Sequence, residues 1–279
     1  MLHQDFEAFA QAIKGADHEV DLYGAAIVIA RLGGHTVDPN RTAAQLDNLA
    51  EAAREHAGEG ASPDALSHAI DHQLFSVHGF HGNTEDYADP ENSYLDRVVQ
   101  RRAGLPITLS LVYMEVAQRI GLQCDGIGYP GHFIVRYGGP EHPTYVDPFQ
   151  QGARIDRAEL LARLRSLDIG TANPETFLAA VTRRQVLQRM LNNLHTIFRD
   201  RRDLDRWYAV LELQLRLEPW NAALVGERGM LHYRLGRADQ AFHDLEAYVA
   251  SGDRLETSTG AIRLLDQLRL RYGGTGEPR

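Results

Sequence analysis

The chain has a single cysteine, Cys124, among 279 residues. One cysteine cannot form an internal disulfide, which excludes the disulfide frameworks of small secreted proteins. Basic residues are also scarce relative to acidic ones, with 29 Lys and Arg against 38 Asp and Glu and a net charge of −9. A general nucleic-acid-binding protein needs a basic face to displace counterions. The sequence therefore predicts no nucleic-acid partner.

Long apolar stretches are absent as well. The longest uninterrupted apolar run is Ala25 to Ala30, far shorter than the roughly 20 residues of a membrane-spanning helix. The first fifteen residues, MLHQDFEAFAQAIKG, carry two acidic residues and no apolar stretch of signal-peptide length. We expect a cytoplasmic protein without a membrane partner. No phosphate-binding loop, dinucleotide fingerprint or nucleophile elbow occurs, so no cofactor is expected.

Hydrophobic residues make up 43% of the chain, enough to build a full core. They recur at helical spacing in the first 75 residues and again from Thr182 to Tyr272, whereas the segments between 123 and 149 resemble short strands. We predict an α+β domain over residues 1–180, with its helical part at the N-terminus, and an all-α domain over residues 181–279. The tail after Tyr272 is expected to be disordered.

The central segment begins with a predicted helix. Pro106 suits the first turn of a helix, where a missing N–H costs nothing. Apolar residues then recur at helical spacing as far as Ile120, and Gly121 can end the helix.

Two short β runs follow this helix, over residues 132–137 and 144–149. If Gly138 to Glu141 forms a four-residue turn, Tyr137 pairs with His142 and His132 lies directly opposite Asp147. A cross-strand pair has its β-carbons about 4.5–5.5 Å apart, close enough for a carboxylate to hydrogen-bond an imidazole. Such an aspartate orients the imidazole, which can accept a proton from a nucleophile at a helix N-terminus. A slip of one residue would separate their faces.

Four stretches of this region carry a family resemblance: NSYL at 92–95, GLPITLS at 104–110, PGHF at 130–133 and VDPF at 146–149. Gly79-Phe80 and Gly82-Asn83 also fit. Together they resemble the SirB family of transglutaminase-like proteins, whose members join such a core to C-terminal tetratricopeptide repeats. The resemblance extends over roughly Leu22 to Tyr248 and implies a papain-like core.

The resemblance also identifies a missing residue. In active transglutaminase-like enzymes the nucleophilic cysteine lies about fifteen residues before the glycine that ends the helix, and counting back from Gly121 gives Pro106. The SirB family lacks the cysteine in the same way. His132 and Asp147 match the other two members of the triad. We expect the pocket beside this pair to be lined by Asn92, Tyr94, Pro106, Tyr129 and Phe149.

Three residues near the dyad could replace the thiol, and each has an alternative interpretation. Thr108 and Ser110 lie near the helix start, but alkoxides are much harder to generate than thiolates, and a capping or packing hydroxyl is the favoured interpretation. Cys124 precedes His132 by eight residues, and a buried structural role is favoured because free cysteines are among the most buried residue types.

Four histidines fall within fourteen residues: His68, His72, His78 and His81. A zinc site needs three or four converging ligands, and no cysteine joins these four, so solvated histidines are favoured and no metal is expected.

The C-terminal half has internal self-similarity. Gly229, Tyr233, Leu235-Gly236 and Ala241 occupy the positions of the small and aromatic packing residues of a tetratricopeptide repeat. One good and one degenerate repeat are too few for a free-standing solenoid, so we expect them to pack against the first domain. An ordinary helical bundle is the alternative.

Two functions follow from these patterns. The first is a non-enzymatic module that binds a protein or peptide through the C-terminal repeats and keeps His132 and Asp147 as a relic. The second is a hydrolase or acyl transferase that uses this pair with Thr108, Ser110 or a water molecule as nucleophile. A hydroxyl within hydrogen-bonding reach of the His132 imidazole would favour the enzyme.

Overall fold

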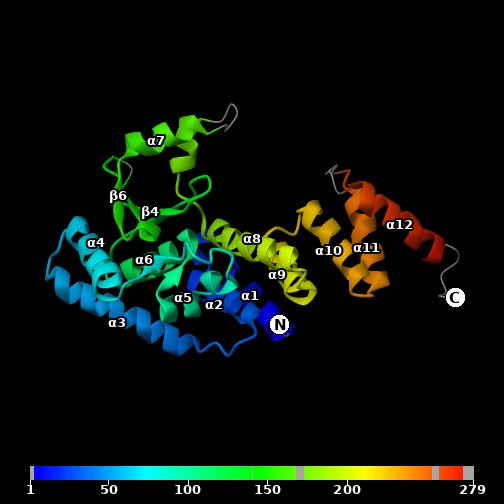
Figure 1. The fold of residues 1–279 in the computed structure, drawn as a ribbon, viewed down its shortest axis with the longest axis horizontal. Helices are drawn as coiled ribbons and strands as arrows, with labels where there is room; N and C mark the ends of the chain where they lie inside the picture. Colours follow the sequence, from blue (N-terminus) through cyan, green and yellow to red (C-terminus); the bar gives the residue numbers. More distant parts are fainter. Residues whose placement is uncertain (1–2, 140, 168–172, 253–257, 273–279) are drawn as a thin grey trace. The chain divides into compact units, whose positions relative to one another are not determined.

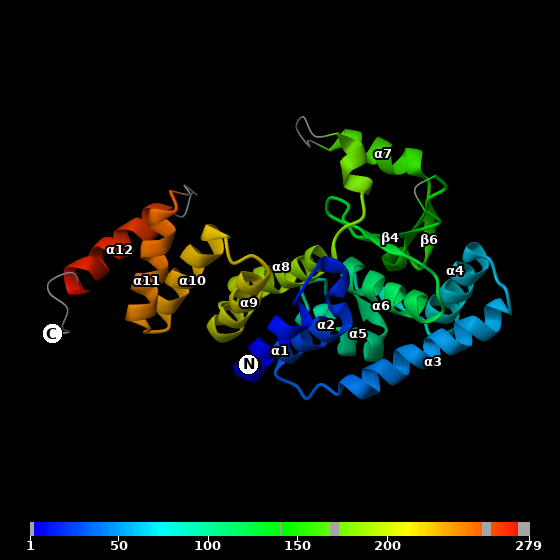
Figure 2. The ribbon, with the colours of Figure 1, turned by 180° about the vertical axis from the view of Figure 1, so that it is seen from behind.

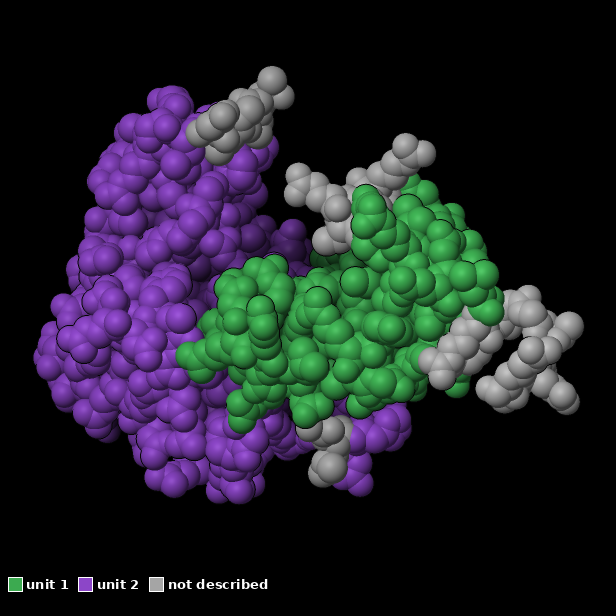
Figure 3. Space-filling view, turned by 45° about the vertical axis from the view of Figure 1, so that its right-hand side comes forward, with its two compact units in different colours: residues 1, 194–279 green, residues 2–193 purple. Residues whose placement is uncertain are grey.

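The structure is a computed structural model that describes residues 3–139, 141–167, 173–252 and 258–272. Two compact units divide the chain: residues 2–193, here the α+β unit, and residues 194–279 together with residue 1, here the helical unit. Figure 3 colours them separately. The predicted α+β class is confirmed. The boundary expected near residue 180 and the docking of the C-terminal helices on the first domain stay predictions.

The α+β unit begins with five helices that precede the central one. Their bounds are α1 His3–Ala12, α2 Leu22–Ala30, α3 Pro39–Ala57, α4 Pro63–Asp71 and α5 Leu95–Arg101. Side-chain caps explain several starts: Asp38 accepts from the Arg41 amide before α3, and Ser62 accepts from the Ala65 amide before α4. Each cap is followed by a proline, which suits the first helical turn.

The central helix, α6, runs from Pro106 to Arg119, and Gly121 follows it with a positive φ of 83°. This confirms the predicted helix and its ending. Nearly all of its side chains are buried, because α3, α4 and α5 contact it (Figures 1 and 2). A helix that is apolar on all sides belongs in the core.

Within the described residues, the main sheet is antiparallel with the order β3-β4-β5-β6. Its strands are β3 Asp125–Ile127, β4 Ile134–Tyr137, β5 Thr144–Asp147 and β6 Ala153–Ile155. The sequence patterns did not predict β6. They also missed a short parallel pairing of β1 His81–Gly82 with β2 Ala103–Gly104.

The register predicted for the hairpin is wrong. Tyr137 pairs with Thr144, two residues beyond the expected His142, so the connecting loop is longer than the four residues assumed. His132 precedes β4 and has no cross-strand partner in the ladder. A shift of two residues keeps every side chain on the same face of the sheet, whereas a shift of one would not.

Helices cover the two faces of this sheet (Figure 1). On one face, Ser110 of α6 donates its hydroxyl to the carbonyl of Phe133, and a β-carbon at Gly126 would meet the ring of Phe133. On the other face, α7 Arg157–Ser166 buries Leu160 and Leu164 against the sheet. Residues of the sheet and of α7 line the cavity that is described below.

The helical unit follows from α8, which spans Arg183–Arg201 and crosses the boundary between the units. The remaining helices are α9 Leu204–Leu217, α10 Ala222–Arg234, α11 Ala238–Ala250 and α12 Ser258–Tyr272. Helices α10 and α11 pack closely because Gly226 and Gly229 leave no room for a side chain: added β-carbons would meet Tyr248 at 2.7 Å and Leu245 at 3.0 Å. The tail 273–279, expected to be disordered, lies outside the described residues.

Candidate functional site

His132 and Asp147 are hydrogen-bonded, as predicted. The Nε2 of His132 lies 2.7 Å from Oδ2 of Asp147. An ionised carboxylate can only accept, so Nε2 carries the proton and Nδ1 is left with a lone pair when the ring is neutral. The carboxylate is almost fully buried, at 5% exposure, and the imidazole is 26% exposed. The pair therefore has one anchored member and one member that solvent or a ligand can reach.

The second carboxylate oxygen of Asp147 is held by backbone amides. Oδ1 accepts hydrogen bonds from the backbone amides of Phe149 at 3.0 Å and Gln150 at 3.2 Å. Asp147 therefore caps the short 3₁₀ turn Pro148–Gln150. This explains the VDPF stretch: the valine lies in β5, the aspartate ends that strand and caps the turn, and the proline starts the turn.

The backbone on the histidine side is held by Arg189 of α8. Its guanidinium donates to the carbonyl of His132 at 2.7 Å and to that of Tyr129 at 3.0 Å. The same guanidinium lies over the Phe133 ring, 5.7 Å from its centroid. These contacts fix the Pro130-Gly131 turn and hence the direction in which the His132 side chain leaves the backbone.

Asn92 is hydrogen-bonded to the start of α6. Its carbonyl accepts from the Thr108 hydroxyl at 2.6 Å, and that hydroxyl in turn accepts from the Leu105 amide at 3.0 Å. The side chain of Asn92 accepts from the Asn83 amide group and donates to the carbonyl of Asp86. The NSYL and GLPITLS stretches therefore meet at the helix N-terminus.

Phe149 packs beside the dyad. Its ring lies edge-on to the His132 ring, with the ring centroids 5.9 Å apart, and edge-on to the Tyr87 ring, with the centroids 6.4 Å apart. A β-carbon at Gly82 would come within 2.5 Å of the Phe149 ring. A glycine at this position therefore allows Phe149 to reach the histidine.

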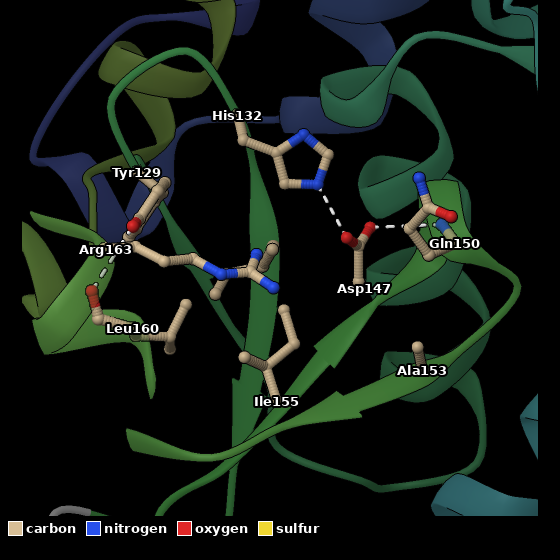
Figure 4. Close-up of a pocket in the computed structure, with 9 residues that line it drawn as sticks. Tyr129, His132, Asp147, Gln150, Ala153, Ile155, Leu160 and Arg163 are labelled. Atoms are coloured by element: carbon tan, nitrogen blue, oxygen red, sulfur yellow. Dashed lines mark hydrogen bonds and ion pairs between the residues drawn. The ribbon is translucent and has the colours of Figure 1, made fainter. Parts of the chain in front are cut away.

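A cavity of about 440 Å³ opens between the sheet and α7 (Figure 4). It is lined by Tyr129, His132, Ile134, Asp147, Gln150, Ala153, Ile155, Leu160 and Arg163. The hydroxyl of Tyr129 donates to the carbonyl of Leu160 at 3.3 Å, and this hydrogen bond holds Tyr129 in the wall of the cavity. The dyad forms one side of the cavity, and α7 forms the opposite side.

Of the predicted site residues, Tyr129, His132 and Asp147 line the cavity, and Phe149 packs against the His132 ring without lining it. Asn92, Tyr94 and Pro106 are buried and do not line this cavity. Thr108 and Ser110 are fully buried, and both hydroxyls donate to backbone carbonyls. The interpretation of these two hydroxyls as capping and packing groups fits their contacts.

The remaining candidates lie outside the dyad. Burial, with a smaller contribution from Asp125, raises the pKa of the Cys124 thiol to about 12, which disfavours the thiolate. His72 stacks on His56 with ring centroids 4.2 Å apart. In the part of the chain that the structure describes, no three His, Cys, Asp or Glu side chains are placed to hold a metal ion.

Two residues of the site, Arg163 and Arg189, were missed by sequence reasoning. Arg163 lies on α7, three residues after the buried Leu160, and no motif of the sequence includes it. Arg189 lies within an amphipathic helix, and its carbonyl partners are 57 and 60 residues away. No local pattern encodes such distant contacts.

Comparison with known proteins defines the class. The sequence model of the transglutaminase-like superfamily matches residues 40–192, more than half of the chain, and that of a tetratricopeptide repeat matches residues 194–266. The chain therefore belongs to the transglutaminase-like superfamily. The repeat-like interpretation of the C-terminal half is confirmed by the second match.

Individual relatives agree with this membership. A UPF0162 protein of Xylella fastidiosa is 32% identical over 237 residues, covering 84% of each chain. A UPF0162 protein of Pseudomonas aeruginosa is 29% identical over 184 residues, 63% of this chain and 64% of that protein. F-box only protein 21 of Mus musculus is 31% identical over 180 residues, 60% of this chain and 28% of that protein. No solved structure matches the chain significantly.

Proposed function

We propose that this chain is a protein- or peptide-binding regulatory module in which the acyl-transfer site of the superfamily persists without its nucleophile. The observation that carries the proposal is the surroundings of His132. Within the described residues, Asp147 is the one side chain hydrogen-bonded to the imidazole, and the position expected for the nucleophile is Pro106.

The hydroxyl groups support this proposal through their hydrogen bonds. Thr108 bridges the Leu105 amide and the Asn92 carbonyl, so its proton and a lone pair are already used. Ser110 donates to the carbonyl of Phe133. Releasing either hydroxyl would leave buried backbone groups unpaired, which costs about 1–3 kcal/mol for each group.

The partner is proposed to bind through the helical unit. Tetratricopeptide-type helices present side chains for protein recognition, and two aromatic residues here are exposed, Trp220 at 78% and Tyr233 at 46%. The net charge of −9 comes from residues 1–193, because residues 194–279 carry 13 basic and 13 acidic side chains, so charge alone selects no partner for the helical unit. The motifs at 92–95, 104–110, 130–133 and 146–149 support the proposal that the chain is a SirB-type protein.

No helix in the described ranges has the length and hydropathy to cross a membrane.

Affinity capture tests the proposal. Full-length protein, the Trp220→Ala variant and the Tyr233→Ala variant are compared for proteins recovered from a cell extract and identified by mass spectrometry. Leu270→Ala is the matched control, because Leu270 is an exposed apolar residue on α12. We expect at least one protein to be lost with Trp220→Ala or Tyr233→Ala and kept with Leu270→Ala. Equal recovery by all four proteins would contradict the proposal.

A water-dependent hydrolase is the second candidate, and one observation favours it. The His132–Asp147 pair is intact, its carboxylate is oriented by two backbone amides, and the lone pair of Nδ1 is directed away from Asp147. An imidazole of this kind can act as a general base toward water. Hydrolysis that is abolished by His132→Ala would identify this function.

A further inference from the structure

The cavity beside the dyad has a largely apolar wall. Ile134 of β4, Ile155 of β6 and Leu160 of α7 face it, and Ala153 lies at its edge. Its volume of about 440 Å³ falls within the range of roughly 300–1,000 Å³ that is typical of ligand pockets. An apolar side chain of a ligand could therefore be transferred from water into this cavity. Its burial would stabilise the complex by about 25 cal/mol for each Å² of apolar surface removed from water.

One cationic side chain enters this apolar space. Figure 4 shows Arg163 extending from α7 across the cavity, toward the side on which His132 and Asp147 lie. Its ion-pair partner in the described structure is Glu159, one helical turn earlier. Both side chains of that pair are more than half exposed, at 58% and 51%, and exposed helical pairs contribute only about 0.3–0.5 kcal/mol. A ligand anion can displace Glu159 at little cost.

The dyad does not compete for the guanidinium. The carboxylate of Asp147 already accepts from His132 and from two backbone amides. Figure 4 also shows Nδ1 of His132 on the edge of the ring that points away from Arg163. A ligand in the cavity therefore meets the carbon edge of the imidazole, and its charged group is recognised by Arg163.

We propose that this cavity binds the C-terminal residue of a peptide chain, with an apolar side chain against Ile134, Ile155 and Leu160 and the terminal carboxylate on the guanidinium of Arg163. The proposal goes beyond the binding through the helical unit proposed above, because it assigns a second binding site, in the α+β unit, and names its ligand class. Arginine suits this role because its planar fork binds a carboxylate with two parallel hydrogen bonds. Gln150, which also lines the cavity, offers an amide to the preceding peptide group.

Isothermal titration calorimetry of the full-length protein tests this assignment with defined probes. The first probe is the acetylated tetrapeptide Ac-Gly-Gly-Gly-Leu with a free carboxylate, and the second is the same peptide as its C-terminal amide. A third ends in glycine in place of leucine, and the fourth is N-acetyl-leucine alone. The protein variants are Arg163→Gln and, as a matched control, Arg165→Gln, because Arg165 is exposed on the same helix and does not line the cavity.

We expect the leucine acid to bind, and its amide to bind at least about tenfold more weakly, because the amide loses a charge-assisted hydrogen bond. The glycine acid should also bind at least about tenfold more weakly, because it has no apolar side chain to bury. Arg163→Gln should weaken the leucine acid by a similar factor, and Arg165→Gln should leave its affinity unchanged. Equal binding of acid and amide, or an unchanged affinity in Arg163→Gln, would refute the role of Arg163. If N-acetyl-leucine binds as tightly as the tetrapeptide, the ligand is a small acid, and the peptide assignment is wrong.

The outcomes of the titration can be distinguished from those of the affinity-capture experiment. Absence of binding by all four probes refutes this ligand class and leaves the capture experiment with Trp220 and Tyr233 variants unaffected. Cleavage of the probes, detected by mass spectrometry after the titration, would contradict the non-enzymatic function itself.

Discussion

Replacing Asp147 by alanine should loosen the site in a measurable and local way. The carboxylate accepts three hydrogen bonds, from Nε2 of His132 at 2.7 Å and from the amides of Phe149 and Gln150 at 3.0 and 3.2 Å. All three are lost in Asp147→Ala, and the capped turn that carries Phe149 loses its cap. Phe149 should then be less firmly held against the His132 ring.

The expected cost follows from these contacts. Loss of the cap contributes about 1 kcal/mol, within a range of roughly 0.5–2. Loss of a hydrogen bond to a charged group contributes about 1.5–3 kcal/mol. Since the imidazole is 26% exposed, water can partly replace the lost carboxylate, which favours the lower part of that range. We expect the free energy of unfolding of the α+β unit to fall by about 2–4 kcal/mol.

Hydrogen exchange followed by NMR is the suitable assay, because both tryptophans, Trp207 and Trp220, lie outside the α+β unit. The amides of Phe149 and Gln150 should exchange at least about fivefold faster in Asp147→Ala, which corresponds to the loss of about 1 kcal/mol from the cap. Asp156→Ala is the control: Asp156 caps α7 by accepting from Ala158, so its loss should leave those two amides unchanged. Unaltered exchange at both amides in Asp147→Ala would refute the anchoring role of the carboxylate.

Three further predictions concern other parts of the chain. Gly226→Ala should destabilise the helical unit in thermal unfolding, because its β-carbon would lie 2.7 Å from the Tyr248 ring on α11. In Gly260→Ala the added β-carbon meets nothing closer than 3.9 Å, so this variant should be more stable by about 0.5–1 kcal/mol. Partial burial raises the pKa of the Cys124 thiol to about 12, so it should react with iodoacetamide at about pH 8 far more slowly in the native than in the unfolded protein, and equal rates would contradict the raised pKa. Burial opposes the charged form of His195, but hydrogen bonding and charge from Glu227 outweigh it and raise the pKa of His195. Its contribution to stability should therefore be complete below about pH 6.5 and be lost as the pH rises through the raised pKa, and His195→Gln should abolish this pH dependence.

The part of the fold that depends on local pattern could be predicted from the sequence. The α6 helix, its proline start and its glycine end follow from spacing and capping preferences, and the 3.6-residue period predicts a helical region from Thr182 to Tyr272 without dividing it into α8 to α12. The β-hairpin was predicted, but its register was wrong by two residues, because loop length depends on the conformation of a glycine-rich loop. Alternation of faces survives such an error, so the His132–Asp147 hydrogen bond could be predicted in spite of it.

The cavity could not be predicted in the same way. It depends on β6 and α7, which the chain places opposite the dyad, and β6 has only three residues, too few for a periodic signal. Asn92 and Tyr94 belong to a motif that resembles the family, but their contacts are with the helix start and with His35. A motif identifies residues that the fold requires, and only the three-dimensional structure separates those that line a cavity from those that support it.

Turnover assays show whether the His132–Asp147 pair persists without acyl transfer. Wild-type protein and His132→Ala are incubated with a series of peptide esters, peptide amides and glutamine-containing peptides, and products and covalent acyl adducts are quantified by mass spectrometry. We expect no acyl adduct and equal background hydrolysis by the two proteins. Product formation that is present in the wild type and absent in His132→Ala would contradict this expectation.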